Sequence, residues 1–195
     1  MILIEDSGNK VGKHKIKNQY WNEQGIEVIR YGLPVGDYVL VNDAMQEMLD
    51  RKEKRGIQPK KMDFLGTYKI AVDSKKDMQE VVGNICGQQH ARFRDEIQLA
   101  ANNGIMLYIL IEDNGGHADK GRKIYNKPCS CIDDVFKWVN PRSCIFYKGK
   151  QKFPNATKGQ QLAKAMITME KKYGCKFVFC KSKDAGREIL QLLNQ

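Results

Sequence analysis

The chain has 195 residues, of which 42% are hydrophobic and 29% are charged, and this composition excludes an intrinsically disordered protein. Its 33 Lys and Arg residues outnumber its 23 Asp and Glu residues and give a formal charge of +10, which favours nucleic acid as a partner, with a merely lysine-rich solvated surface as the alternative. No run approaches the roughly 20 apolar residues that span a bilayer, and the start MILIEDSGNK is unlike a signal peptide, so we expect a cytoplasmic (intracellular) protein without a membrane partner.

Apolar runs predict four β-strands in the N-terminal part of the chain, at residues 1–4, 25–33, 36–41 and 67–73. The third strand opens with a Gly-Asp turn. Residues 42–61 (NDAMQEMLDRKEKRGIQPKK) are highly charged, which predicts an exposed, partly helical insertion rather than core. We find no repeat and no interdomain linker, so we expect a single domain over residues 1–195.

Helices and strands then alternate. Two amphipathic helices are marked by apolar residues at helical spacing, which are Met78, Val81, Val82 and Ile85 in the first and Phe93, Ile97 and Ala100 in the second. The continuous apolar run IMLYILIE (105–112) predicts a strand buried on both faces. Further helices are predicted at 131–139, 160–174 and 184–194, with a strand at 176–180. This alternation predicts an α/β layered domain.

Two smaller features carry predictions of their own. The terminal helix has an apolar face formed by Ile189, Leu190 and Leu193, for which we expect core packing, with a homodimer interface as the alternative. The six cysteines include Cys129 and Cys131 in PCSC, but no paired C-x-x-C motif and no histidine at zinc-ligand spacing accompanies them. We therefore expect reduced, structural thiols.

The strongest candidates for chemistry are Asp37 in GDYVLV and Asp73 and Lys75 in VDSKKD. If the two strands are neighbours, both carboxylates lie near the same end of the sheet, where they could bind a hard cation such as Mg²⁺. Lys75 lies two residues after Asp73 and shares its face of the strand. The simpler alternative for each motif is a polar turn at a strand end.

The ordered combination of LPVGDYVLV, VDSKKD, HARFRDEIQLA and IMLYILIED resembles the nuclease domain of the XPF-type structure-specific endonucleases, in the PD-(D/E)xK nuclease superfamily. The chain is most similar to the short stand-alone versions found in phages and prophages, which implies a phage protein in a bacterial host as one setting. The resemblance implies a restriction-endonuclease-like layered α/β domain, with a central mixed β-sheet flanked by helices.

The resemblance also implies site residues. Asp37 matches the metal-binding acid of the GDY motif, while Asp73 and Lys75 take the positions of the acid and the lysine in the ERK motif. Ser74 stands where the family commonly has arginine. Two further metal-binding acids are implied, for which Asp6 is preferred over Glu5 and Glu80 over Asp77. Gly8 and Asn9 replace an arginine and a glutamate of the family's N-terminal motif.

The segment HARFRDE resembles the part of the family that contacts DNA. His90, Arg92 and Arg94 are therefore candidate phosphate contacts, as is Lys76. Two residues apart on a helix, Arg92 and Arg94 do not share a face, so we expect at most one of them to be central. Phe93 is expected in the core, and Glu96 is expected to form an ion pair with Arg92.

The resulting hypothesis is an Mg²⁺- or Mn²⁺-dependent DNA endonuclease that acts on branched or flapped DNA. The alternative is a catalytically inactive DNA-binding relative of the same fold. Retention of the trio Asp37, Asp73 and Lys75 favours the enzyme, whereas the departures at Gly8, Asn9 and Ser74 favour the alternative.

Overall fold

The computed structural model describes residues 1–12 and 14–195 and contains a six-stranded sheet in the order β10-β5-β4-β3-β1-β2. Its strands are β1 (Ile2–Asp6), β2 (Glu27–Tyr31), β3 (Tyr38–Leu40), β4 (Ile70–Lys75), β5 (Met106–Glu112) and β10 (Lys176–Cys180). Strand β3 is antiparallel to both of its neighbours, β1 and β4, and the other pairs are parallel. The predicted mixed central sheet is confirmed.

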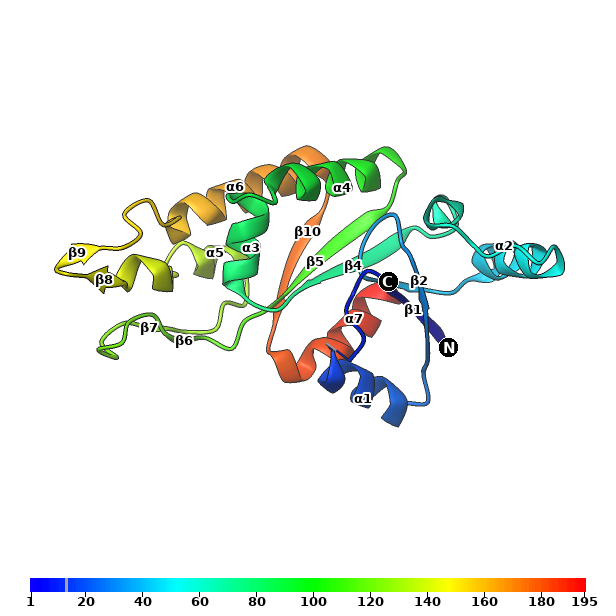
Figure 1. Ribbon diagram of the computed structural model, residues 1–195, viewed down its shortest axis with the longest axis horizontal. Helices are drawn as coiled ribbons and strands as arrows, with labels where there is room; N and C mark the ends of the chain where they lie inside the picture. The colour runs from blue at the N-terminus through cyan, green and yellow to red at the C-terminus, as the bar shows by residue number, and fades with distance from the viewer. Residues whose placement is uncertain (13) are drawn as a thin grey trace.

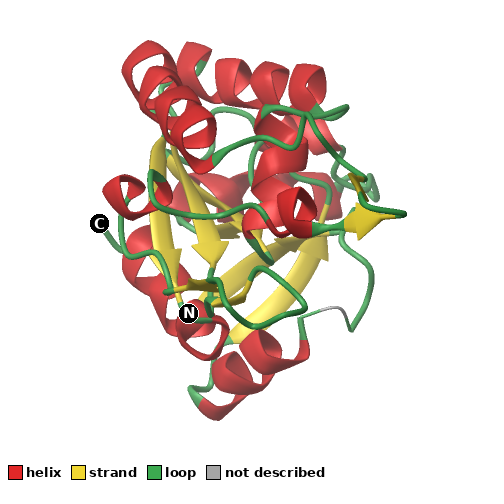
Figure 2. Ribbon diagram, turned by 90° about the vertical axis from the view of Figure 1, so that its left-hand side faces the viewer, coloured by secondary structure: helices red, strands yellow, loops and turns green. Residues whose placement is uncertain are grey.

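Helices cover both faces of this sheet (Figures 1 and 2). One layer contains α3 (Met78–Ile85), α4 (His90–Asn102) and α6 (Gly159–Tyr173), and the other contains α1 (Lys15–Glu23) and α7 (Ala185–Leu193). Strand β5 contributes Ile109 and Ile111 to the core under the first layer and Leu110 to the core under the second. The sequence-based prediction of a strand buried on both faces is therefore confirmed.

Helix α7 packs into the second core, because Ile189 and Leu193 are buried there against the sheet. This confirms the expectation of core packing for the apolar face of the terminal helix. Helix α1 was not expected from the sequence. Its buried positions are Lys17 and Trp21, and since one of them is charged, no apolar stripe is visible in the sequence.

The charged segment 42–61 is less exposed than expected. It contains α2 (Asp43–Lys54), and Asn42 caps the start of this helix. The Asn42 side chain accepts a hydrogen bond from the Met45 backbone N–H. Met45 and Met48 are buried in the first core, so the helix is anchored there, while residues 53–58 are exposed. Figure 1 shows α2 at one end of the molecule.

Three short 3₁₀ helices and two hairpins complete the described part of the chain. These elements are η1 (Lys61–Phe64), η2 (Pro141–Cys144) and η3 (Ser182–Asp184), with the strands β6 (Gly116–His117), β7 (Tyr125–Asn126), β8 (Phe146–Tyr147) and β9 (Lys150–Gln151). The helix predicted at 131–139 is reduced to α5 (Ile132–Val135). After Val135, the backbone N–H groups of Phe136, Lys137 and Trp138 donate to carbonyl groups three residues back rather than four, so the α-helical pattern is not continued.

Within the described residues, no helix is long and apolar enough to cross a membrane. All six cysteines are free, and Cys129 and Cys175 are buried.

Candidate active site

Asp37 and Asp73 lie side by side because β3 and β4 are neighbours, which meets the condition under which the sequence placed both carboxylates near the same end of the sheet. Tyr38 pairs with Val72, and the Asp37 backbone N–H donates to the Val72 carbonyl oxygen at 2.8 Å. The close approach requires glycine at position 36, where φ is +78° and an added Cβ would lie 2.8 Å from the Ala71 Cβ. The Gly-Asp dipeptide therefore positions the carboxylate against the neighbouring strand.

The Asp37 carboxylate is held from two sides. Its Oδ1 accepts a hydrogen bond from the Asn9 side-chain amide at 3.0 Å, and its Oδ2 accepts one from the Ser74 backbone N–H at 2.9 Å. Asn9, a departure from the resembled family, thus has a direct role in orienting this carboxylate. Sequence reasoning did not assign Asn9 a contact, because the two residues are 28 positions apart.

Asp73 and Lys75 lie on one face of β4, as the spacing of two residues predicted, and the structure shows that they form a buried ion pair there. The Lys75 Nζ lies 2.8 Å from the Asp73 Oδ1 and 2.6 Å from its Oδ2, and both residues are less than a tenth exposed. Burial raises the pKa of Asp73, Lys75 opposes that shift, and the carboxylates of Asp37 and Glu96 add to it. Burial disfavours the charged form of Lys75, but Asp73 and Asp37 outweigh it and hold the pKa of Lys75 above its ordinary value.

These side chains face a cavity of about 420 Å³, which we call the acidic cavity. Its charged lining residues are Asp6, Asp37, Asp73, Glu80, Glu96, Lys61, Lys75 and Arg92. The structure thus brings together Asp6, Asp37, Asp73, Lys75, Glu80 and Arg92 from the residues predicted from the sequence. The Asp6 Oδ1 accepts a hydrogen bond from the Leu33 backbone N–H at 2.8 Å, which fixes it at the rim of β1.

Glu96 is a member of this cavity that sequence reasoning misassigned. Its Oε1 accepts the Gly36 backbone N–H at 2.9 Å, and no ion pair joins it to Arg92 among the described residues. The expected ion pair is therefore wrong, because the turn before β3 provides Glu96 with a closer donor. One sequence signal could have placed Glu96 in this cavity. It lies four residues after Arg92, so the two side chains share a face of the helix.

Other predicted residues lie outside the acidic cavity. Arg94 is exposed and pairs with Asp95 at 2.8 Å, whereas Arg92 lines the cavity, so the expectation that they point in different directions is confirmed. His90 is exposed at the start of α4. Glu5 lines a different hollow, where its Oε2 lies 3.5 Å from the Arg30 Nε. Burial raises the pKa of the Glu5 carboxyl group.

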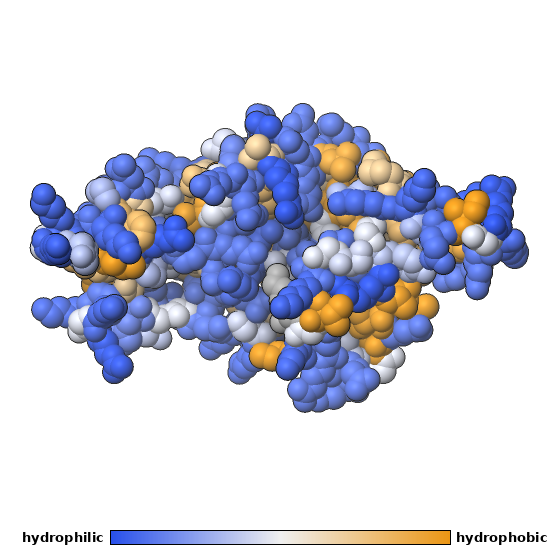
Figure 3. Space-filling model, viewed as in Figure 1, coloured by the Kyte–Doolittle hydropathy of each residue, from blue (hydrophilic) through white to orange (hydrophobic). Residues whose placement is uncertain are grey.

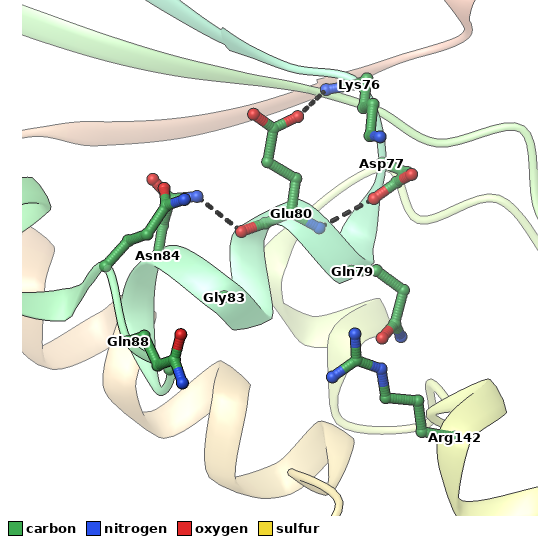
Figure 4. Close-up of a pocket in the computed structure, with 10 residues that line it drawn as sticks. Lys76, Asp77, Gln79, Glu80, Gly83, Asn84, Gln88 and Arg142 are labelled. Atoms are coloured by element: carbon green, nitrogen blue, oxygen red, sulfur yellow. Dashed lines mark hydrogen bonds between the residues drawn. The ribbon is translucent and has the colours of Figure 1, made fainter.

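A second cavity, of about 690 Å³, adjoins the first and is shown in Figure 4. Asp77 begins α3 there by accepting the Glu80 backbone N–H at 2.8 Å, which makes it a helix cap. The Glu80 Oε2 in turn accepts the Lys76 backbone N–H at 3.0 Å. Glu80 lines both cavities, while Lys76 lines only the second. Arg142 approaches from the opposite side in Figure 4.

A buried cation from α1 lies behind position 74. The Lys17 Nζ donates to the Ser74 Oγ at 3.2 Å and forms an ion pair with the Glu112 Oε1 at 2.5 Å. Ser74 is the position where the resembled family commonly has arginine. The Lys17 ammonium from α1 therefore lies against Ser74, the position where the family commonly has a positively charged side chain. Nothing in the sequence around Ser74 indicates this contact.

The acidic cavity contains oxygen ligands of the kind that hard cations prefer. Within the described residues, no three His, Cys, Asp or Glu side chains already form a metal-binding cluster. Asp37 and Asp73 nevertheless face the same space, and the pKa of buried Asp73 is raised by burial and by nearby carboxylates, a cost that a bound cation would relieve. One or two carboxylates with water and substrate phosphate suffice for Mg²⁺, so these residues fit such an ion.

Comparison with known proteins agrees with this architecture. The sequence model of the ERCC4 domain matches residues 4–193. The fold is similar to that of XPF from Aeropyrum pernix, with a TM-score of 0.51 and 14% identity over 100% of this chain and 60% of that one. It is also similar to the same organism's XPF in complex with DNA, with a TM-score of 0.51 and 16% identity over 99% of this chain and 63% of that one.

This chain thus spans less than two thirds of the length of those structures. No curated protein has a significant sequence match to it. The resemblance to the XPF-type nuclease domain and the predicted α/β fold, a mixed sheet flanked by helices, are confirmed.

Proposed function

The chain belongs to the ERCC4 domain family, and from this premise we propose that it is a divalent-metal-dependent DNA endonuclease that hydrolyses phosphodiester bonds in branched or flapped DNA. The observation that carries the proposal is the convergence of Asp37, Asp73 and Lys75 on one cavity, with the Lys75 ammonium in contact with Asp73. A structural neighbour that was solved in complex with DNA supports DNA as the partner.

Each member of the trio has a separate role. Asp37 and Asp73 would hold the Mg²⁺ or Mn²⁺, with Asp6 or Glu80 as a further ligand, because their oxygens face the acidic cavity. When bound, such an ion lowers the pKa of a water ligand and neutralises charge on the phosphate. The Lys75 ammonium is kept charged by its carboxylate neighbours and would orient the attacking water or stabilise charge that develops on the phosphate.

Phosphate groups on either side of the cut bond would bind the cations at the rim. Lys61 and Arg92 line the acidic cavity from η1 and α4, and their side chains can neutralise phosphate without reading sequence. Selectivity would then come from the shape of the DNA. The predicted phosphate contacts Lys76 and His90 would bind the flanking backbone, whereas Arg94 is paired with Asp95 outside the cavity and would contribute little.

The second candidate function is that of a DNA-binding relative that does not cut. Ser74 in place of an arginine favours it, because a family cation is missing from that side chain. The hydrogen bonds that orient Asp37 favour the enzyme, since orientation of a carboxylate has no use in binding a phosphate of the same charge.

The deciding experiment measures cleavage of labelled flap, fork and duplex DNA with Mg²⁺, with Mn²⁺ and with chelator. The variants are Asp37→Asn and Asp73→Asn, with Asp95→Asn as the matched control, because Asp95 is an exposed acid outside the cavity that pairs with Arg94. We expect metal-dependent cleavage that both cavity variants abolish and the control retains. Thermal unfolding of each variant checks the fold.

Two outcomes would contradict the enzyme. Cleavage that survives in both Asp37→Asn and Asp73→Asn would place the chemistry elsewhere. DNA binding without cleavage under every metal condition would establish the inactive relative instead.

A further inference from the structure

The acidic cavity is one of three hollows whose lining residues overlap. It shares Glu80, Asn84 and Gln89 with the second cavity. The second cavity shares Gln79, Gly83, Gly87 and Arg142 with a third, of about 380 Å³, which ends at Lys152 and Phe153. We call the second and third cavities together the lateral groove. It joins the candidate active site to the base of the β8–β9 hairpin.

The β8–β9 hairpin extends from the body of the molecule at the end opposite α2 (Figure 1). Phe146 and Tyr147, both in β8, are 65% and 66% exposed. At this end, Figure 3 shows a small apolar area within a largely hydrophilic surface. Adjacent strand residues point to opposite faces, so the hairpin presents one ring on each face. Two adjacent exposed rings on one hairpin provide apolar area that gains free energy when a partner buries it.

Positive charge surrounds these rings. Residues 142–158 contain no acidic residue and carry five basic ones, which are Arg142, Lys148, Lys150, Lys152 and Lys158. The Lys148 Nζ lies 5.5 Å from the centroid of the Tyr147 ring, and Arg142 and Lys152 lie 5.8 Å and 5.5 Å from the centroid of the Phe153 ring. Tyr147 and Phe153 thus each have a cation beside the ring, and a ring with an adjacent cation is the combination that binds an unpaired base together with its phosphate.

We propose that the lateral groove and the β8–β9 hairpin bind a single-stranded DNA segment that runs from the active site, with bases stacked on Phe146, Tyr147 and Phe153 and phosphates on the neighbouring cations. This proposal rests on the proposed function, because it assigns the single-stranded arm of the same substrate. The amide side chains of Gln79, Asn84 and Gln88 in the groove can donate to and accept from base edges.

The chemistry favours single-stranded DNA over duplex DNA and over a protein. Bases in a duplex are already stacked on one another, so exposed rings gain contacts only from unpaired bases. A second copy of this chain would bring the same basic hairpin against itself, and like charges repel. A polyanion with free bases is the occupant that satisfies both the rings and the lysines.

The test measures binding of a fluorescent oligo(dT) strand in the presence of chelator, so that cleavage plays no part. The double variant Phe146→Ala/Tyr147→Ala is compared with Ile57→Ala/Met62→Ala, which removes two exposed apolar side chains (46% and 57% exposed) near α2. We expect the hairpin variant to bind about tenfold more weakly or worse, and the control to bind within about twofold of the wild type. Phe146→Tyr/Tyr147→Phe keeps both rings and should retain affinity.

A second readout reports stacking and charge separately. A 2-aminopurine in the strand should be quenched by the wild type and not by the alanine variant. Lys148→Gln/Lys150→Gln should flatten the salt dependence of binding, by roughly 0.7 in slope for each lost phosphate contact.

Three results would overturn the proposal. The first is equal oligo(dT) affinity in wild type and alanine variant. The second is an equal loss of affinity for blunt duplex DNA. The third is self-association of the wild type, by sedimentation, that the alanine variant abolishes. If the wild type cleaves DNA but the hairpin variants bind oligo(dT) as tightly as the wild type, only this proposal is refuted. If the hairpin binds single-stranded DNA but the protein cleaves no DNA, only the proposed nuclease activity is refuted.

Discussion

The ammonium group of Lys17 lies 3.2 Å from the hydroxyl oxygen of Ser74, although 57 residues separate them in the chain. The same ammonium pairs with Glu112 on β5. Helix α1 therefore delivers a buried cation behind the strand that carries Asp73 and Lys75, and this contact joins the second helical layer to the candidate site.

Breaking this contact should destabilise the protein. Lys17→Met leaves Glu112 mostly buried without its partner, so we expect the free energy of unfolding to fall by about 3 kcal/mol. Lys17→Met/Glu112→Gln removes both charges and should recover part of that loss. Urea unfolding of the two single variants and the double variant measures the coupling. Additive effects of the two substitutions would show that the pair contributes no interaction energy.

Lys75 should act on the reaction and not on DNA affinity. Lys75→Met removes the only ammonium in contact with Asp73 among the described residues, so we expect cleavage to slow by about 10²- to 10³-fold. Lys76→Met is the matched control, since its side chain belongs to the neighbouring cavity. Single-turnover rates and binding constants separate the two effects. A rate that matches the control would remove Lys75 from the mechanism.

Gly36 should tolerate no side chain. At Gly36, an added Cβ would lie 2.8 Å from the Ala71 Cβ, at a φ of +78°. At Gly66, φ is +87° and no atom lies within 4 Å. Both alanine variants carry the backbone cost, so Gly36→Ala should lose about 1–3 kcal/mol more stability than Gly66→Ala. Equal losses of stability for the two variants, in thermal or urea unfolding, would show that the segment around Gly36 and β4 move apart at little cost to make room for the Cβ.

Arg92 and Arg94 should differ in their effect on DNA. Arg92 lines the acidic cavity, whereas Arg94 is exposed and paired with Asp95. Arg92→Gln should weaken binding to any duplex sequence and reduce the salt slope by about 1, and Arg94→Gln should leave both nearly unchanged. Titrations at several salt concentrations measure the slope. The reverse order of effects would place the DNA on the opposite face of α4.

The cysteines should react with alkylating reagents according to their burial. Burial raises the pKa of Cys129, Cys175 and Cys180 to about 12, so almost no thiolate forms at neutral pH. Cys131 is exposed. We expect iodoacetamide to modify Cys131 first in the folded protein and the other three only after unfolding, as mass spectrometry of the peptides would show. Rapid native labelling of Cys175 would indicate local opening of the strand it precedes.

Local sequence patterns were sufficient for much of the site. The spacing of Asp73 and Lys75 placed both side chains on one face of a strand, and the glycine before Asp37 marked the turn that positions it. These inferences hold because a strand alternates its side chains with a period of two and a tight turn demands glycine, and both constraints act within a few residues. The apolar run 105–112 likewise identified its strand as buried on both faces.

Only the tertiary structure decided which distant groups complete that site. Asn9 orients Asp37, Glu96 accepts the Gly36 N–H, and Lys17 contacts Ser74 from a helix that shows no apolar stripe. The sequence alone indicated none of these pairs, because each depends on the order of strands in the sheet and on which helix covers which face. A hydrogen bond forms only between polar groups that lie about 3 Å apart in the folded protein. For residues on different segments, that distance depends on how the sheet and the helical layers pack together, and no single segment determines it.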